Sequence, residues 1–98
     1  MNNYELTLIL RIGDTLESLK TTAKDLLKKH GIEIQSEEEW GIRKLAYEID
    51  REREGFYFFF NVQAPPESIQ ETINDFRLNN DILRYLFVKM KKEKAPQN

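Results

Sequence analysis

The chain has 98 residues, of which 40% are hydrophobic and 33% charged, and it contains no cysteine. This length supports one small domain with a single core, and the lack of cysteine excludes disulfides and thiolate metal sites. The net charge of −2 argues weakly against a nucleic-acid partner. The N-terminus lacks the basic start and apolar segment of a signal peptide, and no stretch predicts a membrane span, so we expect a cytoplasmic protein.

The first third of the chain predicts a strand followed by a helix. Residues 4–11 alternate between apolar and polar side chains, as a half-buried strand does. Asp14 with Glu17 has the spacing of a capping box. Apolar side chains then recur every three or four residues, which predicts an amphipathic helix. Gly31 is placed to end that helix in a left-handed conformation.

Two further strands are predicted in the middle of the chain. Residues 32–49 predict one long strand, with an irregularity near Trp40-Gly41 because glycine inside a strand often marks a bulge. Asp50–Glu54 is predicted to form a charged turn. Residues 55–64 then predict a strand with aromatic side chains on both faces, which Pro65-Pro66 terminates.

The last third predicts a helix, a strand and a tail. A helix can begin near Pro66, because proline is tolerated in the first turn, and Ile69, Ile73 and Phe76 form its apolar stripe. Asn79–Asp81 ends this helix, and Ile82–Met90 is the last strand. We expect one domain over residues 1–92, followed by a polar, disordered tail over residues 93–98.

The order βαββαβ predicts a ferredoxin-like α+β fold. Two right-handed βαβ crossovers place four strands in an antiparallel sheet with both helices on one face. The first and third strands should lie in the centre and the second and fourth at the edges. The predicted core between sheet and helices comprises Leu6, Leu8, Leu26, Leu27, Phe58, Phe60, Ile73 and Phe76.

The other face of the sheet is then open, and it is predicted to carry apolar side chains. Ile9, Tyr57 and Phe59 should point outward from their strands. In the last strand both alternating sets, Tyr85 with Phe87 and Leu86 with Val88 and Met90, are largely apolar, so the sequence does not decide which set faces out. An exposed apolar patch usually marks a binding surface; the alternative is that a small sheet simply exposes some aromatics.

The sequence contains few residues that could catalyse a reaction or bind a metal or phosphate. His30, the only histidine, lies at a predicted helix end, where a structural role suits it better than catalysis or metal binding. The run Glu37–Glu39 is interpreted as solvated surface rather than a divalent-ion site. There is no glycine-rich phosphate loop, and the segment Arg11–Asp14 is too short and acidic for an acylphosphatase loop. We therefore predict no catalytic residue, metal, cofactor or small-molecule substrate, with a ferredoxin-like enzyme or regulatory domain as a remote alternative.

Charge is segregated along the chain. Residues 33–54 hold four basic and eight acidic side chains, a balance of −4, whereas residues 77–94 hold six basic and two acidic ones, a balance of +4. A basic patch can bind phosphate on a protein that is acidic overall, because distant charges are screened. The alternative is that lysines protect an edge strand from aggregation. The predicted RNA-binding residues are Arg77, Arg84, Lys89, Lys91 and Lys92.

One alternative is an RRM, which has the same fold and stacks RNA bases on sheet aromatics. Residues 54–60 loosely resemble its RNP1 strand. The match is imperfect: Glu54 stands where the motif begins with Lys or Arg, Tyr57 where it has a small residue, and Asn61 where it has an aromatic.

The chain resembles the family of bacterial small-subunit ribosomal protein six from Tyr4 to about Lys92. Tyr4-Glu5 opens the first strand as in that family, and Gly55-Phe56-Tyr57 follows the hairpin turn. The central signature is matched by Gly41, Arg43, Leu45, Ala46, Tyr47 and Ile49, and the last helix and strand by Arg77, Ile82 and Arg84. The aromatic run over residues 56–60 departs from the family pattern, and the tail lacks the long acidic extension of some members.

The resemblance implies a structural protein of the small ribosomal subunit, without enzymatic activity or cofactor. It implies binding to 16S ribosomal RNA in the central domain together with small-subunit ribosomal protein eighteen, as a heterodimer. Because the second strand is acidic and lies at an edge, we expect the basic partner there and RNA on the fourth-strand side, on separate surfaces. The predicted partner-binding residues are Trp40, Arg43, Ala46, Tyr47, Tyr57 and Phe59.

Overall fold

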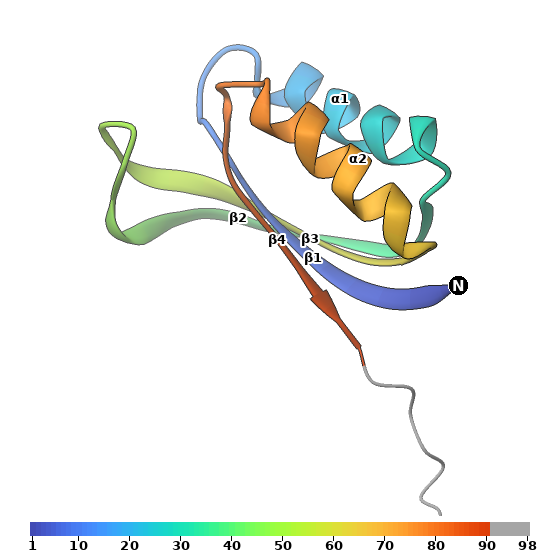
Figure 1. The fold of residues 1–98 in the computed structure, drawn as a ribbon. Coiled ribbons are helices and arrows are strands. Elements are labelled where there is room, and N and C mark those ends of the chain that lie inside the picture. The colour runs from blue at the N-terminus through green and yellow to red at the C-terminus, as the bar shows by residue number, and fades with distance from the viewer. Residues whose placement is uncertain (91–98) are drawn as a thin grey trace, which may run out of the picture.

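The computed structural model describes residues 1–90. Its elements, in chain order, are β1 (Asn2–Leu10), α1 (Leu16–Lys29), β2 (Glu33–Ile49), β3 (Glu52–Ala64), α2 (Pro66–Arg77) and β4 (Ile82–Lys89). The strands form one antiparallel sheet in the order β2-β3-β1-β4. Both helices lie on one face of it (Figure 1). The predicted ferredoxin-like fold is confirmed, with β1 and β3 central and β2 and β4 at the edges.

The start of α1 differs from the prediction, whereas its end agrees with it. The predicted capping box at Asp14 is wrong: Thr15 is the N-cap residue, and its side chain makes no capping hydrogen bond. The left-handed cap is confirmed, since Gly31 has a φ of 75°. The Gly31 N–H donates to Lys28 O at 3.0 Å and the Ile32 N–H to Leu27 O at 3.0 Å, which is a Schellman motif.

Helix α2 begins at Pro66 as predicted, but it buries a different stripe. Ser68, Thr72 and Phe76 are buried against the sheet, whereas Ile73 is only half-buried. The small side chains at four-residue spacing let this face of the helix approach the sheet closely. The Thr72 hydroxyl donates to Ser68 O at 2.8 Å, which satisfies it inside the core. The prediction that Ile73 is fully buried is therefore wrong, and Leu26 of α1 is likewise only half-buried.

The core lies between the helices and the sheet, and large side chains of β1 and β3 form its base. Phe58 and Phe60 are completely buried, with ring centroids 4.4 Å apart. From β4, Tyr85 and Phe87 pack against the core, each with its ring about 6 Å from that of Phe76. This decides the face of β4 that the sequence left open. The remaining predicted core residues Leu6, Leu8, Leu27 and Phe76 are also completely buried.

Strands β2 and β3 form a long hairpin that extends past the helices (Figure 1). Its turn is shorter than predicted, because Asp50 and Arg51 alone adopt positive φ angles, of 49° and 68°, as the central pair of a type I′ turn does. Strand β3 therefore begins at Glu52. The predicted irregularity near Trp40 is confirmed: the pairing register shifts between Glu39 and Gly41, and Gly41 has a φ of 85°.

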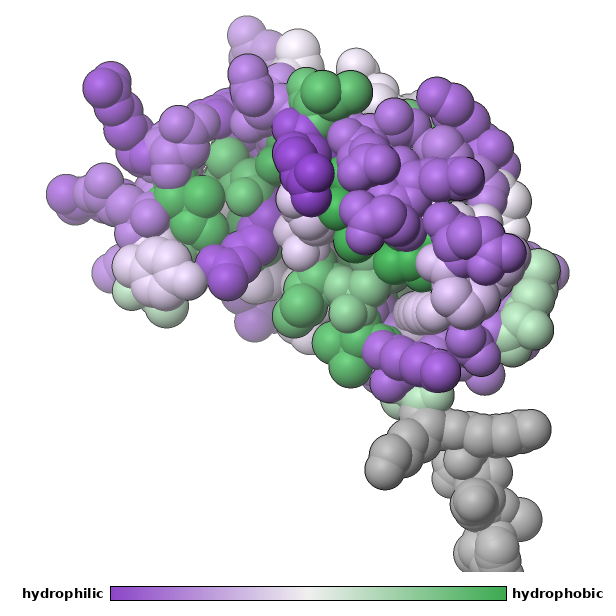
Figure 2. All heavy atoms as spheres, in the orientation of Figure 1, coloured by the Kyte–Doolittle hydropathy of each residue, from purple (hydrophilic) through white to green (hydrophobic). Residues whose placement is uncertain are grey.

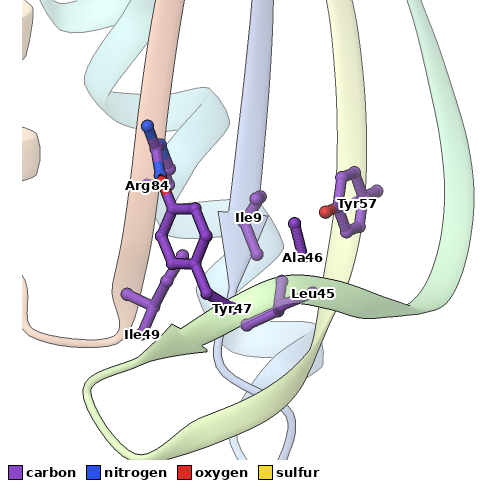
Figure 3. Close-up of a pocket in the computed structure, with 7 residues that line it drawn as sticks. All are labelled: Ile9, Leu45, Ala46, Tyr47, Ile49, Tyr57 and Arg84. Carbon is purple, nitrogen blue, oxygen red and sulfur yellow. The ribbon is translucent and has the colours of Figure 1, made fainter.

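A larger irregularity lies near the turn. Lys44 pairs with Glu54 and the next pair is Ile49 with Glu52, so β2 contains three more residues than β3 over this stretch. We call residues 45–49 the strap: residues 45–48 have no partner in the ladder, and the segment crosses the open face of the sheet (Figure 3). A Cβ at Gly55 would lie 2.4 Å from the Ile9 Cγ2 atom. Glycine at this position therefore lets Ile9 pack beneath the strap.

Candidate binding surface

The open face of the sheet exposes large apolar side chains from both edge strands. Leu86, Val88 and Met90 of the β4 side are 56%, 46% and 40% exposed, and Trp40 and Tyr47 of β2 are 41% and 62% exposed. Hydrophobic atoms gather over β4, whereas the outer surface of the helices is mostly hydrophilic (Figure 2). A face left for water alternates apolar inward with polar outward, so this surface has the character of a binding site.

Aromatic side chains stack near the middle of this face. The rings of Trp40 and Phe59 are nearly parallel, at 9°, with centroids 5.3 Å apart. The Arg43 guanidinium lies 5.7 Å from the centroid of the Trp40 ring, within the range of a cation–π interaction. The structure thus brings together three of the predicted partner-binding residues. The indole covers one side of the Phe59 ring, which removes that side as a stacking platform for an RNA base.

The strap closes a pocket of about 270 Å³ against the sheet. The Arg84 Nη1 group donates a hydrogen bond to the Tyr47 hydroxyl at 2.7 Å, and its guanidinium lies 5.9 Å from the Tyr47 ring centroid. This hydrogen bond raises the pKa of Arg84. Figure 3 shows Tyr47 reaching across from β2 to Arg84 on β4. The pocket is lined by Ile9, Leu45, Ala46, Tyr47, Ile49, Tyr57 and Arg84.

The contact between Tyr47 and Arg84 corrects the expected division of surfaces. These two residues were assigned to opposite edges of the sheet, one facing a protein partner and the other facing RNA. The three extra residues of β2 carry Tyr47 over β1, so the two side chains meet on the open face. At this end of the molecule Tyr47 and Arg84 therefore share one surface, where the sequence analysis had expected them on separate ones.

The predicted RNA-binding side chains do not form one cluster within residues 1–90. Arg77 is exposed at the end of α2. Arg84 pairs with Ile9 and shares the open face, whereas Lys89 pairs with Tyr4, a core residue, and so points to the opposite face. Lys89 lies five positions along the strand from Arg84, which is roughly 16 Å. Lys91 and Lys92 lie outside the described residues.

An ionic cluster that the sequence analysis missed surrounds Arg11. Its Nη1 lies 2.6 Å from Glu52 Oε2 and its Nε lies 3.0 Å from Asp81 Oδ1. Its Nη2 contacts the Asp50 carboxylate and donates to Asn80 O at 3.1 Å. The hydrogen bonds to Asp50, Glu52 and Asp81 raise the pKa of Arg11. These partners are 39 to 70 residues away in sequence, and local spacing gives no signal for such a cluster.

Other polar clusters on the helix side join elements together. Glu37 and Glu39 of the acidic run pair with Lys24 and Lys20 of α1, each at 3.1 Å. The run is thus partly paired, where the sequence analysis interpreted it as solvated surface. His30 Nε2 lies 2.6 Å from Asp75 Oδ2 and so links the two helices, as a structural histidine does. In residues 1–90, no group of three or more His, Asp or Glu side chains could hold a metal ion.

The family model of Ribosomal protein S6 matches residues 3–89 of this chain. The chain belongs to this family. It is 41% identical over 95 residues to small ribosomal subunit protein bS6 of Christiangramia forsetii, covering 94% of this chain and 85% of that protein. It is 35% identical to the bS6 protein of Bartonella bacilliformis, covering 85% of this chain and 61% of the relative.

Solved structures agree with this assignment. The crystal structure of 30S ribosomal protein S6 from Thermotoga maritima superposes with a TM-score of 0.83 at 26% identity, covering 91% of this chain and 87% of that one. The C-terminal domain of the MgtC protein from Mycobacterium tuberculosis superposes with a TM-score of 0.61, covering 97% of this chain and 94% of that one. Its identity is 8%, so it shows a shared fold alone.

Membership of the S6 family identifies the chain as a structural protein of the small ribosomal subunit, and not as an enzyme. This decides against the alternatives of a stand-alone RRM and of a ferredoxin-like enzyme. Neither α1 nor α2 is long and apolar enough to span a membrane.

Proposed function

We propose that this chain binds 16S ribosomal RNA in the central domain (platform) of the small subunit together with small-subunit ribosomal protein eighteen, as a heterodimer. Two findings support this proposal. The first is membership of the S6 family, which implies a place among ribosomal RNA and ribosomal proteins. The second, which carries the argument for a protein partner, is the apolar open face of the sheet.

The open face suits a protein better than RNA. Its apolar side chains run across the sheet from Leu86 and Val88 on β4 to Trp40 on β2. Glu5 lies on this face opposite Val88 in the pairing register, and Glu38 lies opposite Phe59. These carboxylates repel phosphate but complement a basic protein. The proposed partner surface is therefore the open face, including the six predicted partner-binding residues that lie on it or on the strap.

RNA contact is proposed along the β4 side of the molecule. Lys89 lies at this edge and faces away from the open surface, and Arg77 lies at the end of α2, just before β4. A chain with a net charge of −2 supplies few phosphate contacts by itself. A basic partner docked on the open face would add positive charge, so RNA affinity should depend strongly on the partner.

Two residues with equal exposure on opposite faces provide a matched pair of variants. Leu86 and Ile42 are both 56% exposed, and Ile42 pairs with the core residue Phe56, so it lies on the helix side of the sheet. We expect Leu86→Asp to weaken binding of ribosomal protein eighteen by about tenfold or more, because it places a charge in an apolar interface. Ile42→Asp should leave that affinity within about twofold. Titration calorimetry with the purified proteins measures both.

The RNA side of the proposal is tested with a fragment of the 16S central domain. Binding should be weak for the chain alone and at least tenfold tighter with the partner present, and it should fall as salt concentration rises. Tight binding without the partner would contradict the proposal. So would an Ile42→Asp variant that disrupts the protein pair as strongly as Leu86→Asp does.

A further inference from the structure

The strap has few hydrogen bonds of its own to hold it across the sheet. Residues 45–48 have no partners in the ladder between β2 and β3. The only buried strap side chain is Leu45, which is 8% exposed, while Ala46, Tyr47 and Glu48 are exposed. Besides the burial of Leu45 and the hydrogen bond from Arg53 Nε to Glu48 Oε2 at 3.2 Å, its position over the sheet is fixed by contacts at its two sides. One is the hydrogen bond between Tyr47 and Arg84, and the other is the Arg11 cluster at the adjoining turn.

Arg11 joins the turn that follows the strap to the loop before β4. Asp50 and Glu52 belong to the turn and to the first residue of β3, and Asp81 belongs to the loop between α2 and β4. The Arg11 side chain is 26% exposed, and the N–H of the same residue donates to Asp81 O at 2.8 Å. The planar guanidinium has several donors in a fixed geometry. One side chain at the end of β1 can thus hold both segments at once.

Arg11 differs from the residue of a simple ion pair, because its single positive charge is shared by three carboxylates. One guanidinium faces three carboxylates, so its removal would leave two negative groups of the turn beside the negative group of the loop. Like charges that are held around one side chain repel each other. The turn and the loop would then be pushed apart, and the strap would move away from β4 with the turn.

We propose that Arg11 is the positioning residue of the open-face pocket: by bridging the β2–β3 turn and the α2–β4 loop, it holds the strap closed and keeps Tyr47 against Arg84. The pocket then depends on a side chain that does not line it. We call Arg11 with its three carboxylate partners the clamp. These carboxylates are 35% to 62% exposed, so solvent ions reach them and the clamp is sensitive to salt.

The test uses Arg11→Gln, which removes the charge and leaves a shorter polar side chain. Nuclear Overhauser contacts between the Tyr47 ring and the Arg84 side chain report whether the strap is closed. We expect these contacts in the unmodified protein, their loss in Arg11→Gln, and their partial return in Arg11→Lys. In the unmodified protein they should weaken as salt rises to about 1 M, where the Debye length is about 3 Å.

Lys24→Gln is the matched control. Lys24 also joins β2 to another element by a partly exposed ion pair, 3.1 Å from Glu37, but far from the strap in the β2 sequence. It should lower the midpoint of thermal unfolding less than Arg11→Gln does, because it removes one ion pair rather than three, and it should leave the contacts of Tyr47 unchanged. Retention of the Tyr47–Arg84 contacts in Arg11→Gln, or their equal loss in Lys24→Gln, would overturn the proposal.

A second measurement links the clamp to binding and rests on the proposed function. Arg11→Gln should weaken the affinity for ribosomal protein eighteen severalfold, because a mobile strap must be ordered on binding, and Arg11→Lys should restore part of it. If the Tyr47–Arg84 contacts are lost and the affinity does not change, the clamp stands and the assignment of the partner to this end of the open face is wrong. The two failures are therefore distinguishable.

Discussion

The two faces of the sheet are built from the same strands and use their residues in opposite ways. Phe58 and Phe60 point toward the helices and are completely buried. Their neighbour Phe59 points to the open face, half-buried beneath Trp40. Side chains alternate between faces along a strand, so adjacent residues of one type can serve two purposes. The helix face supplies the stability of the fold, and the open face presents apolar surface that a partner can bury.

The largest expected effect tests this comparison with adjacent residues of β3. Phe58→Ala should lower the free energy of unfolding by about 3–5 kcal/mol, because it leaves a cavity in the core. Phe59→Ala should lower it by only about 1 kcal/mol, through the loss of a half-buried stacking contact. Urea denaturation of both variants measures the difference.

The comparison would fail if the two variants lost equal stability, since the open face would then contribute to the core. Because a small domain is stable by only about 5–15 kcal/mol, Phe58→Ala needs to be measured at low temperature or in a stabilising buffer. The affinity for ribosomal protein eighteen provides a second measurement. Phe59→Ala should weaken this affinity clearly, although it lowers the stability of the fold only a little.

A smaller effect is expected where the open face is most tightly packed. Gly55→Ala should cost about 1–3 kcal/mol, because the new Cβ would meet Ile9 at 2.4 Å and that buried side chain must shift. The Tyr47–Arg84 contact should weaken as well, since Ile9 lies beneath the strap. Combining Gly55→Ala with Ile9→Ala should relieve the overlap, so that the two changes together cost less than their sum. Additive losses would contradict the close packing.

The smallest effect concerns an ionic contact on the helix side. The hydrogen bond from His30 lowers the pKa of Asp75 in the folded protein, with a further contribution from Lys29. A lowered pKa means that the carboxylate stabilises the fold above its usual pKa of about 4, and that this contribution is lost as pH falls through the folded value. Asp75→Asn should therefore be less stable than the unmodified protein near pH 5, and the difference should shrink toward pH 2.

Exposed Asp25 of α1 offers the control for this pH series. The stability of Asp25→Asn relative to the unmodified protein is compared with that of Asp75→Asn at each pH. Urea midpoints measured at several pH values give both curves. A difference between Asp75→Asn and the unmodified protein that persists unchanged below about pH 3 would show that the carboxylate is not held by this ionic contact.

Much of the fold could be predicted because its signals are local. The alternation of apolar and polar side chains predicted the strands, and the three- and four-residue spacing of apolar side chains predicted the helices. Gly31 indicated the end of α1. The errors have local causes too. Thr15 rather than Asp14 is the N-cap residue, and the spacing of isoleucines in α2 suggested a buried stripe that Ser68 and Thr72 occupy instead. Small polar residues can face a core when a hydrogen bond satisfies them, which hydropathy alone does not show.

The candidate surface was predicted only in part, because its geometry depends on distant residues. The aromatic side chains of the open face followed from strand alternation. The position of the strap did not, since it depends on three extra residues in β2 and on ion pairs formed by Arg11 across 39 to 70 residues. Gly55 was the one local sign of it, because a glycine inside a strand indicates the close approach of another segment.

The pairing of β1 also sets the order in which the sheet can be completed during synthesis. This strand is made first, yet it lies between β3 and β4, and its Tyr4 pairs with Val62 on one side and with Lys89 on the other. Both contacts span most of the chain, and such long-range pairing forms slowly. The nascent chain must therefore keep β1 unpaired until β3 has emerged from the ribosome, and one edge of β1 unpaired until β4 has emerged as well. During synthesis on one ribosome, the central strand of a protein destined for another thus keeps at least one edge open.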